Sequence, residues 1–271
     1  RGDPVTRASL LLALLFAAGQ APGAALAYET RHVVIVVVDG ARYSETFGDA
    51  TYAQVPRQAL DLAPQGGFAT CWNAGVTTTN PGHAAILSGV YQPIANDGSE
   101  RPHLPLVFEY YRAATGAPRT QAWFFSAKPK LDVMSNSDDP AYGDSLGAMV
   151  DVTCPTDSAA IARAEAVLLA GHPALVAVNL AQTDQIGHTG DWVGYLAAIH
   201  RADSLVYDLW LTIQSDTALA DRTTLFVTND HGRHDDAHGG FTGHGCGCDG
   251  CRRPASPASP CWRRWAASAA R

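Results

Sequence analysis

Three apolar stretches of this chain are each followed by side chains that can bind a metal ion or move a proton. These side chains are Asp39 after residues 32–38, Asp184 and His188 after 174–180, and Asp230 and His231 after 224–228. Imidazole together with carboxylate favours zinc or a similar transition ion, because Mg²⁺ and Ca²⁺ select oxygen ligands. Asp184 and His188 are four residues apart, which would place them on one face of a helix within reach of one ion. Taken alone, that spacing fits a solvated Asp–His pair at a helix start equally well.

A fourth segment, residues 76–89, carries a hydroxyl at the start of a predicted helix. Pro81 suits the first helical turn, and the apolar residues after it continue the helix. Thr79 and Asn80 are therefore expected at the helix N-terminus, where free backbone N–H groups and the helix dipole favour an oxyanion. Coordination to a metal ion can make a threonine hydroxyl a nucleophile at neutral pH. The simpler alternative is that Thr79 or Asn80 only caps the helix.

The apolar stretches are typical of strands in a parallel sheet. The run HVVIVVV at 32–38 has no polar break after its histidine, which suits a strand buried on both faces. Similar runs occupy 121–125, 174–180 and 224–228, and helical patterns cover 159–170 and 192–213. This alternation predicts an α/β fold with a mainly parallel sheet sandwiched by helices. Ligands of such sheets bind at the carboxyl ends of the strands, so the side chains above are expected to meet there.

The composition excludes several classes of protein. Hydrophobic residues make up 46% of the 271 residues and charged residues 17%, which provides a packed core and argues against disorder. There are 19 Lys+Arg and 26 Asp+Glu, so the net charge is −7, and the only lysines are Lys128 and Lys130. Such a chain binds polyanions poorly, so a nucleic-acid scaffold is not expected as a partner.

Residues 1–27 have the pattern of a secretory signal peptide. Arg1 and Arg7 precede an apolar run at 10–18, and the small-x-small triplet at 25–27 suits a cleavage site. The run is too short for a comfortable membrane span, so no stable span is expected after removal of this segment. We therefore predict export to a periplasm or to the outside of the cell, with a buried N-terminal helix as the alternative.

The six cysteines fit an exported protein. An even number in that compartment suggests disulfides, whose pairing the sequence leaves open. The cluster of Cys246, Cys248 and Cys251 also suits a zinc knuckle, although a second matching pair is missing. Residues 28–251 are predicted to form a single domain, and 252–271 an irregular tail that is disordered, or an aberrant or truncated end.

Five motifs occur in an order that resembles a known superfamily. They are VVIVVVDG (33–40), TTTNPGHAAILSG (77–89), TDQIGHTG (183–190), TNDHGRHDD (228–236) and GHGCG (243–247). This set resembles the alkaline phosphatase superfamily, in particular its type I phosphodiesterase/nucleotide pyrophosphatase branch. The resemblance implies a three-layer fold and a metal-dependent phosphoric ester hydrolase, either a phosphodiesterase or a phosphatase.

The resemblance also implies two divalent metal ions, which the ligand types favour as Zn²⁺, and a small phosphorylated substrate. One ion would be held by Asp39, Thr79, Asp230 and His231, and the other by Asp184, His188 and a third histidine. That histidine is expected to be His244, and His238 is the competing choice.

The mechanism implied by the resemblance uses Thr79 as the nucleophile. Its oxygen would attack phosphorus and form a phospho-threonine intermediate that water then releases, while Asn80 would hold a non-bridging phosphate oxygen. Lys128 could contact a charged substrate, although a solvated surface lysine is the commoner case. His83 is expected to pack or hydrogen-bond below the site rather than to bind metal.

Three alternatives stay open at this point. A sulfatase-like member would need Cys or Ser in a Cys/Ser-x-Pro-x-Arg pattern, whereas this chain has Thr79 first and His83 last. A metal-dependent phosphomutase-like member would usually carry a large second domain, for which this chain is short. The third alternative is a non-catalytic, truncated metal-binding relic, which the composition of the tail favours.

Overall fold

The computed structural model describes residues 29–69, 75–234, 240–245 and 265–268. Its strands are β1 (His32–Val38), β2 (Ala122–Ser126), β3 (Met149–Asp151), β4 (Leu175–Leu180), β5 (Thr223–Thr228) and β6 (Trp265–Ser268). They form one sheet in the order β3-β2-β4-β1-β5-β6, in which β6 pairs antiparallel with β5 and all other pairs are parallel. The predicted signal peptide, His238 and every cysteine except Cys154 lie outside the described residues.

Helices connect the strands. The α-helices are α2 (Thr79–Ser88), α3 (Val107–Thr115), α4 (Gly143–Leu146), α5 (Asp157–Gly171), α6 (Gln182–Thr189) and α7 (Trp192–Ser215). Shorter helical turns are η1 (Tyr43–Glu45), η2 (Arg57–Leu62), η3 (Ala63–Gln65), η4 (Arg119–Gln121), η5 (Pro129–Ser135) and η6 (Gly240–Thr242). The two predicted helices lie within α5 and α7, so both predictions are confirmed.

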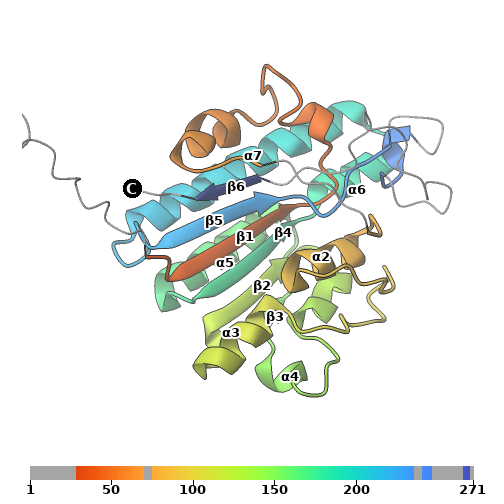
Figure 1. The fold of residues 1–271 in the computed structure, drawn as a ribbon. Coiled ribbons are helices and arrows are strands. Elements are labelled where there is room, and N and C mark those ends of the chain that lie inside the picture. Colours follow the sequence, from red (N-terminus) through yellow and green to blue (C-terminus); the bar gives the residue numbers. More distant parts are fainter. Residues whose placement is uncertain (1–28, 70–74, 235–239, 246–264, 269–271) are drawn as a thin grey trace, which may run out of the picture.

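The core lies on both faces of the sheet, because side chains alternate along each strand. On β1, Val34, Val36 and Val38 belong to a cluster with residues of α5 and α7, whereas Val33 and Ile35 pack into a cluster with residues of α2 and α3. Burial of each such side chain contributes about 1.5–3 kcal/mol. The predicted α/β sheet sandwiched by helices is therefore confirmed (Figure 1).

The register of the central strands places the candidate residues. Val38 of β1 pairs with Leu180 of β4, and Val37 pairs with Thr228 of β5. Because the three strands run parallel, the residues that follow them leave the sheet at the same edge. The expectation that the Asp and His residues meet at the carboxyl ends of the strands is therefore confirmed.

The edge strand β6 differs from the sequence expectation. No strand was expected after residue 252, yet Trp265–Ser268 pairs antiparallel with β5. A segment of four residues gives no recognisable apolar alternation, so the sequence pattern carried no signal for it. The three-residue strand β3 escaped prediction for the same reason.

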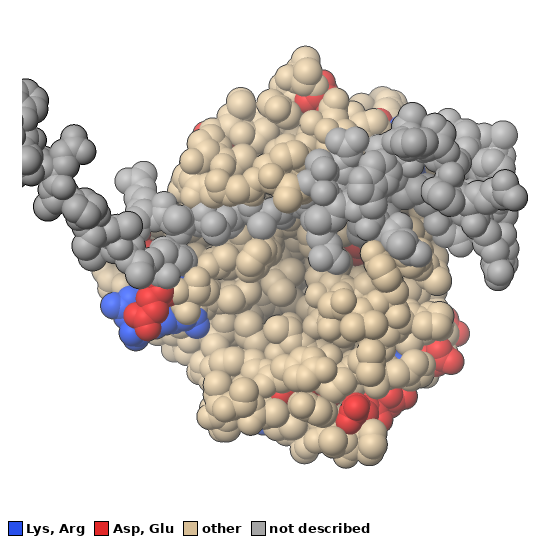
Figure 2. All heavy atoms as spheres, viewed as in Figure 1, with Lys and Arg blue, Asp and Glu red and all other residues tan. Residues whose placement is uncertain are grey.

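The surface in Figure 2 is mostly uncharged. Lys and Arg gather at the left edge of the described part of this face, and Asp and Glu lie along its lower right edge. None of the described helices is both long and apolar enough to cross a membrane.

Candidate metal centre

Two overlapping groups of carboxylates and imidazoles lie at the carboxyl edge of the sheet. One group contains Asp39, Asp184 and His231, and the other contains Asp184, His188 and His244. Within each group the ligand atoms all lie within 4.8 Å of one another. Asp184 therefore belongs to both groups. Below, the first is called the sheet group, which also includes Asp230, and the second is called the α6 group.

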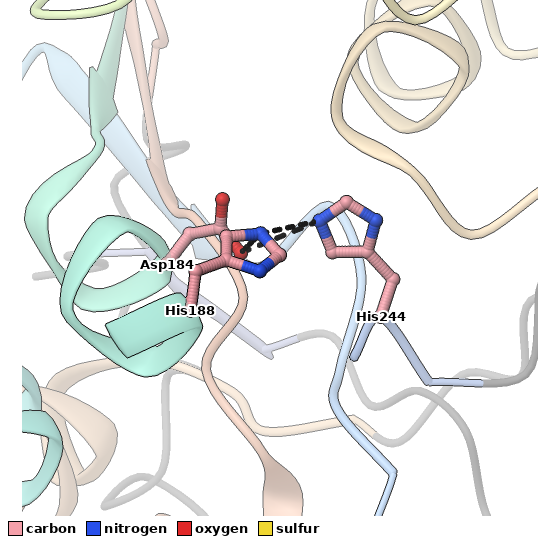
Figure 3. A group of neighbouring side chains, drawn as sticks. All are labelled: Asp184, His188 and His244. Carbon is pink, nitrogen blue, oxygen red and sulfur yellow. Dashed lines mark hydrogen bonds and ion pairs between the residues drawn. The ribbon is translucent and has the colours of Figure 1, made fainter. Parts of the chain in front are cut away.

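The α6 group joins a helix to a loop (Figure 3). Asp184 Oδ1 lies 3.3 Å from His188 Nε2 and 3.6 Å from His244 Nε2, and the two Nε2 atoms are 3.0 Å apart. His188 Nδ1 lies 2.8 Å from the carbonyl oxygen of Thr242, to which it can donate. That hydrogen bond fixes the tautomer in which Nε2 carries the lone pair for an ion. The predicted four-residue spacing is thus realised on α6.

The sheet group is buried and built on strand ends. Asp39 follows β1, and Asp230 and His231 follow β5; all three side chains are fully buried. His231 Nε2 lies 3.3 Å from Asp39 Oδ1 and 3.5 Å from Asp230 Oδ2. His231 Nδ1 lies 3.1 Å from the carbonyl oxygen of Gly232, which leaves Nε2 to face the two carboxylates.

These residues fit a divalent ion. Asp39 Oδ1 and Asp230 Oδ2 are buried and lack a hydrogen-bond partner among the described residues. An imidazole nitrogen lies 3.3 Å from each of these oxygens, His231 Nε2 from Asp39 Oδ1 and His83 Nδ1 from Asp230 Oδ2. A buried carboxylate oxygen that accepts no hydrogen bond is still costly, and a bound cation offsets that cost. Mixed Asp and His donors suit zinc.

Gly40 brings the two groups together. Its φ of +70° is left-handed, and its N–H donates to Asp230 Oδ1 over 3.1 Å. A Cβ atom at this position would lie 2.9 Å from Asp184 Oδ1. Only glycine therefore lets the end of β1 approach Asp184 this closely.

Thr79 is the first residue of α2 and points at the sheet group. Its Oγ1 lies 3.4 Å from His231 Nε2, and the side chain is fully buried. The N-cap is Thr78, which makes no side-chain hydrogen bond to the helix, so the capping alternative does not account for Thr79. Gly82 lets α2 pack closely, since a Cβ there would lie 2.6 Å from the carbonyl oxygen of Asp230.

Two of the three donor hydrogens of Asn80 bond to the protein. Its backbone N–H donates to Asn96 Oδ1 over 2.9 Å, and its Nδ2 donates to the carbonyl oxygen of Lys130 over 3.0 Å. Lys130 Nζ in turn donates to Asn96 Oδ1 over 3.0 Å. These bonds tie the start of α2 to the loop of Asn96 and to η5. The second hydrogen of Nδ2 is not used by these bonds.

Lys128 holds a more central place than the sequence suggested. Its Nζ donates to Asp39 Oδ2 over 2.8 Å, to Asp184 Oδ2 over 2.6 Å and to Thr79 Oγ1 over 3.3 Å. The residue is buried, which by itself lowers its pKa, but Asp39, Asp184 and Asp230 raise the pKa overall. Lys128 is therefore a permanent cation beside the hydroxyl rather than a solvated surface lysine.

Asn179 and His83 support the sheet group from below. Asn179 Nδ2 donates to Asp39 Oδ2 over 3.3 Å, while its Oδ1 lies 3.1 Å from His83 Nε2. His83 Nδ1 lies 2.8 Å from the carbonyl oxygen of Thr79 and 3.3 Å from Asp230 Oδ2. His83 thus hydrogen-bonds beneath the site, as expected. Asn179 was missed, although it is the polar break in the apolar run at 174–180.

Opposite charges set the protonation of the ligands. Burial lowers the pKa of His231, but Asp230, Asp39 and Asp184 outweigh this effect and raise it to about 9. The pKa of Asp184 lies far below its usual range despite burial, because His188, His244 and Lys128 stabilise its charged form. Burial lowers the pKa of His244 and so favours the neutral form that binds metal.

Asp157 anchors the helix that carries the α6 group. Its Oδ1 accepts a hydrogen bond from the backbone N–H of Ala181 over 2.7 Å, and its Oδ2 accepts one from Gln182 over 3.0 Å. Burial raises the pKa of this carboxyl to about 6. The carboxylate satisfies free N–H groups at the start of α6.

The fold and the two groups define an α/β protein with the donor set of a metalloenzyme. Residues 135–247 match a family model described as the Metalloenzyme superfamily. A curated 2,3-bisphosphoglycerate-independent phosphoglycerate mutase from Gracilaria tenuistipitata var. liui is 35% identical over 60 residues, which make up 22% of this chain and 11% of that protein.

Solved structures share the fold. Murine ectonucleotide pyrophosphatase/phosphodiesterase 5, solved as an inactive variant with AMP, superposes with a TM-score of 0.54 at 17% identity, covering 74% of this chain and 57% of that one. A Vibrio parahaemolyticus protein of the alkaline phosphatase superfamily gives a TM-score of 0.57 at 10% identity, covering 89% and 60%. This chain thus spans less than two thirds of these relatives. The resemblance to the alkaline phosphatase superfamily is confirmed.

Proposed function

We propose that this protein is an exported two-metal phosphoric ester hydrolase that acts through Thr79. The observation that carries the proposal is the position of the Thr79 hydroxyl, which lies at the N-terminus of α2 and 3.4 Å from His231 Nε2. A hydroxyl next to a set of metal ligands and 3.3 Å from the buried ammonium of Lys128 suits attack on a phosphoryl group.

The proposed ligand sets draw on the two groups, with Asp184, which belongs to both, assigned to the second ion and Thr79 added to the first. Asp39, Thr79, Asp230 and His231 would hold one divalent ion, and Asp184, His188 and His244 the other, with zinc favoured by the donor types. Such ions lower the pKa of a bound hydroxyl and offset charge on a phosphoryl group and its leaving oxygen.

The residues of the chain divide the remaining work. The Thr79 hydroxyl releases its proton to solvent and its oxygen attacks phosphorus in line. The bond from phosphorus to the ester oxygen breaks, and that oxygen leaves with the electron pair and takes up a proton from water. Water then attacks the phospho-threonine, which releases phosphate and restores the hydroxyl. Lys128, 3.3 Å from Thr79 Oγ1, would contact a phosphoryl oxygen in both steps. Asn80 would hold a second oxygen through the second hydrogen of Nδ2.

Two of the similar proteins support this reaction class. The murine phosphodiesterase was solved with AMP, a small phosphorylated molecule, and its inactive form carries a threonine-to-alanine substitution. A small phosphorylated substrate is therefore proposed for this chain as well. The curated match to a phosphoglycerate mutase favours a second candidate, a phosphomutase-like transfer.

Hydrolysis of model substrates tests the proposal. We expect the zinc-loaded protein to release p-nitrophenol from p-nitrophenyl phosphate or from bis-p-nitrophenyl phosphate. Thr79→Ala should lower kcat by roughly 10³-fold or more and keep both ions, whereas Thr79→Ser should retain activity because it keeps the hydroxyl. Full activity of Thr79→Ala would exclude the covalent route. Movement of phosphate within a phosphosugar or phosphoglycerate, without release, would favour the phosphomutase-like candidate.

Export is tested separately. The apolar run at 10–18 and the triplet at 25–27 support a cleaved signal peptide. Making residues 11–15 polar should retain the protein inside the cell, as measured by fractionation. Unchanged secretion of that variant would contradict export by this segment.

A further inference from the structure

Arg233 lies behind the α6 group and contacts both of the segments that form it. It is buried, with 6% of its surface exposed. Its Nη2 donates to the backbone oxygen of Asp184 over 2.6 Å and to Asp184 Oδ1 over 2.5 Å. Its Nη1 donates to the backbone oxygen of Phe241 over 2.7 Å. One guanidinium therefore joins helix α6 to the segment that leads to His244.

The backbone of Arg233 reinforces the same connection. Arg233 and His244 form an antiparallel bridge, and the Gly245 N–H donates to the Gly232 carbonyl over 2.9 Å. The main-chain bonds of Gly232 and His234, on either side of Arg233, thus hold the segment that carries His244, while the Arg233 side chain holds Asp184. Asp184 and His244 are therefore both positioned by contacts at Arg233.

Two glycines make room for Arg233. A Cβ atom at Gly187, on α6, would lie 2.3 Å from Arg233 Nε, and a Cβ at Gly245 would lie 2.9 Å from the Arg233 backbone. Gly187 is inside a helix, where glycine costs about 1 kcal/mol relative to alanine. The close approach of the guanidinium gives a physical reason for a glycine there.

The chemistry of the contact requires arginine. A planar guanidinium donates in two directions at once, which an ammonium on a flexible stem does not reproduce. On its other side the guanidinium lies over the Tyr195 ring of α7, with 5.8 Å between Cζ and the ring centroid. Asp184 is held from opposite carboxylate oxygens, by Arg233 at Oδ1 and by Lys128 at Oδ2. Each oxygen keeps a lone pair for an ion.

We propose that Arg233 is a positioning residue that sets the separation between α6 and the 240–245 segment, so that Asp184, His188 and His244 face one another before an ion binds. This inference rests on the part of the proposed function in which the α6 group holds a divalent ion. It assigns a task to a residue that touches no substrate.

The test uses four variants of the full chain. Arg233→Gln removes both the positive charge and the guanidinium that donates in two directions. Arg233→Lys keeps only the charge. Gly187→Ala retains Arg233 but displaces its guanidinium, because the new methyl group occupies its place. Gly171→Ala is the matched control, since a Cβ at Gly171, the last residue of α5, meets no atom within 4 Å.

Zinc binding is measured by competition with a chromophoric chelator and by metal analysis. Arg233→Gln and Gly187→Ala should each lower the affinity for one of the two zinc ions by about 10- to 100-fold and leave the affinity for the other unchanged. Arg233→Lys should recover only part of the loss. In the His188→Ala background, Arg233→Gln should cause no further loss, because the affected ion is already gone.

A second readout needs no metal and no activity. In the metal-free protein, hydrogen exchange at the Gly245 N–H should be faster in Arg233→Gln and Gly187→Ala than in wild type and Gly171→Ala. Wild-type zinc affinity in either variant, or unchanged exchange in both, would overturn the proposal; should Arg233→Gln not fold, Gly187→Ala decides alone. A wild-type protein that binds two ions but hydrolyses nothing would refute the proposed function and leave this inference intact.

Discussion

The sheet group and the α6 group offer similar donor atoms but are built differently. Asp39, Asp230 and His231 are fully buried and come directly off β1 and β5, whose positions the sheet fixes. In the α6 group, 43% of the His188 side chain and 20% of the His244 side chain are exposed, and His244 lies on a loop. Strands therefore pre-position the first group, whereas the second depends on hydrogen bonds from Arg233 and Asp157.

The largest expected effect concerns the buried charges of the sheet group. Asp39→Ala should lower the free energy of unfolding of the metal-free protein by about 3–5 kcal/mol, because Lys128 and His231 each lose a buried counter-charge. Urea unfolding measures this change. His188→Ala is the control from the α6 group and should cost less than about 1 kcal/mol, because its side chain is partly exposed. Equal losses in the two variants would contradict the contrast between the groups.

A smaller effect is a pH dependence of the free energy of unfolding that comes from Asp157, the carboxylate at the start of α6. The pKa of this carboxyl is raised from 3.8 to about 6 on folding. The folded state thus holds the proton more tightly, so its stabilising contribution is present below pH 3.8 and is lost as pH rises through about 6. The shift corresponds to roughly 3 kcal/mol.

The control for this prediction is Asp157→Asn, which does not titrate. The difference in unfolding free energy between wild type and this variant, measured from pH 4 to 7 in urea, should move against the wild type as pH rises. A constant difference over that range would show that Asp157 does not titrate in the folded protein.

The smallest expected effect is a difference in affinity between the two proposed ions. Because the ligands of the α6 group are more exposed, its ion should be released first by a chelator, at roughly tenfold lower affinity, which is about 1.4 kcal/mol. Stepwise dialysis with metal analysis measures the release. His188→Ala should lack the first step and keep the second. Simultaneous loss of both ions from wild type would mean that the groups bind as one unit.

The sequence predicted the parts of the site that depend on strand ends. β-branched runs mark buried strands, and parallel strands share a carboxyl edge, so Asp39, Asp184 and Asp230 were expected to meet there and do. Contacts made by long side chains carried no such signal. Lys128 and Arg233 reach the site from loops, and nothing in their spacing indicates which carboxylates they contact.

The hydrogen-bond partners of Asn80 could not be predicted from the sequence either. A helix N-terminus predicts free N–H groups, but the side chain that occupies one of them, Asn96, lies 16 residues away on an irregular loop. Loop geometry of this kind follows from tertiary packing rather than from local propensity. The strand β6 shows the same limit, because its pairing with β5 is visible only in the assembled sheet.

The close approach at Gly40 has a consequence for variation at this position. Any side chain at position 40 would push Asp184 away, while the N–H of residue 40 would still hold Asp230. A single substitution would therefore move Asp184 and Asp230 apart. A second substitution near Asp230 alone would not return Asp184 to its position. The spacing between Asp184 and Asp230 is therefore governed by the absence of a side chain at Gly40.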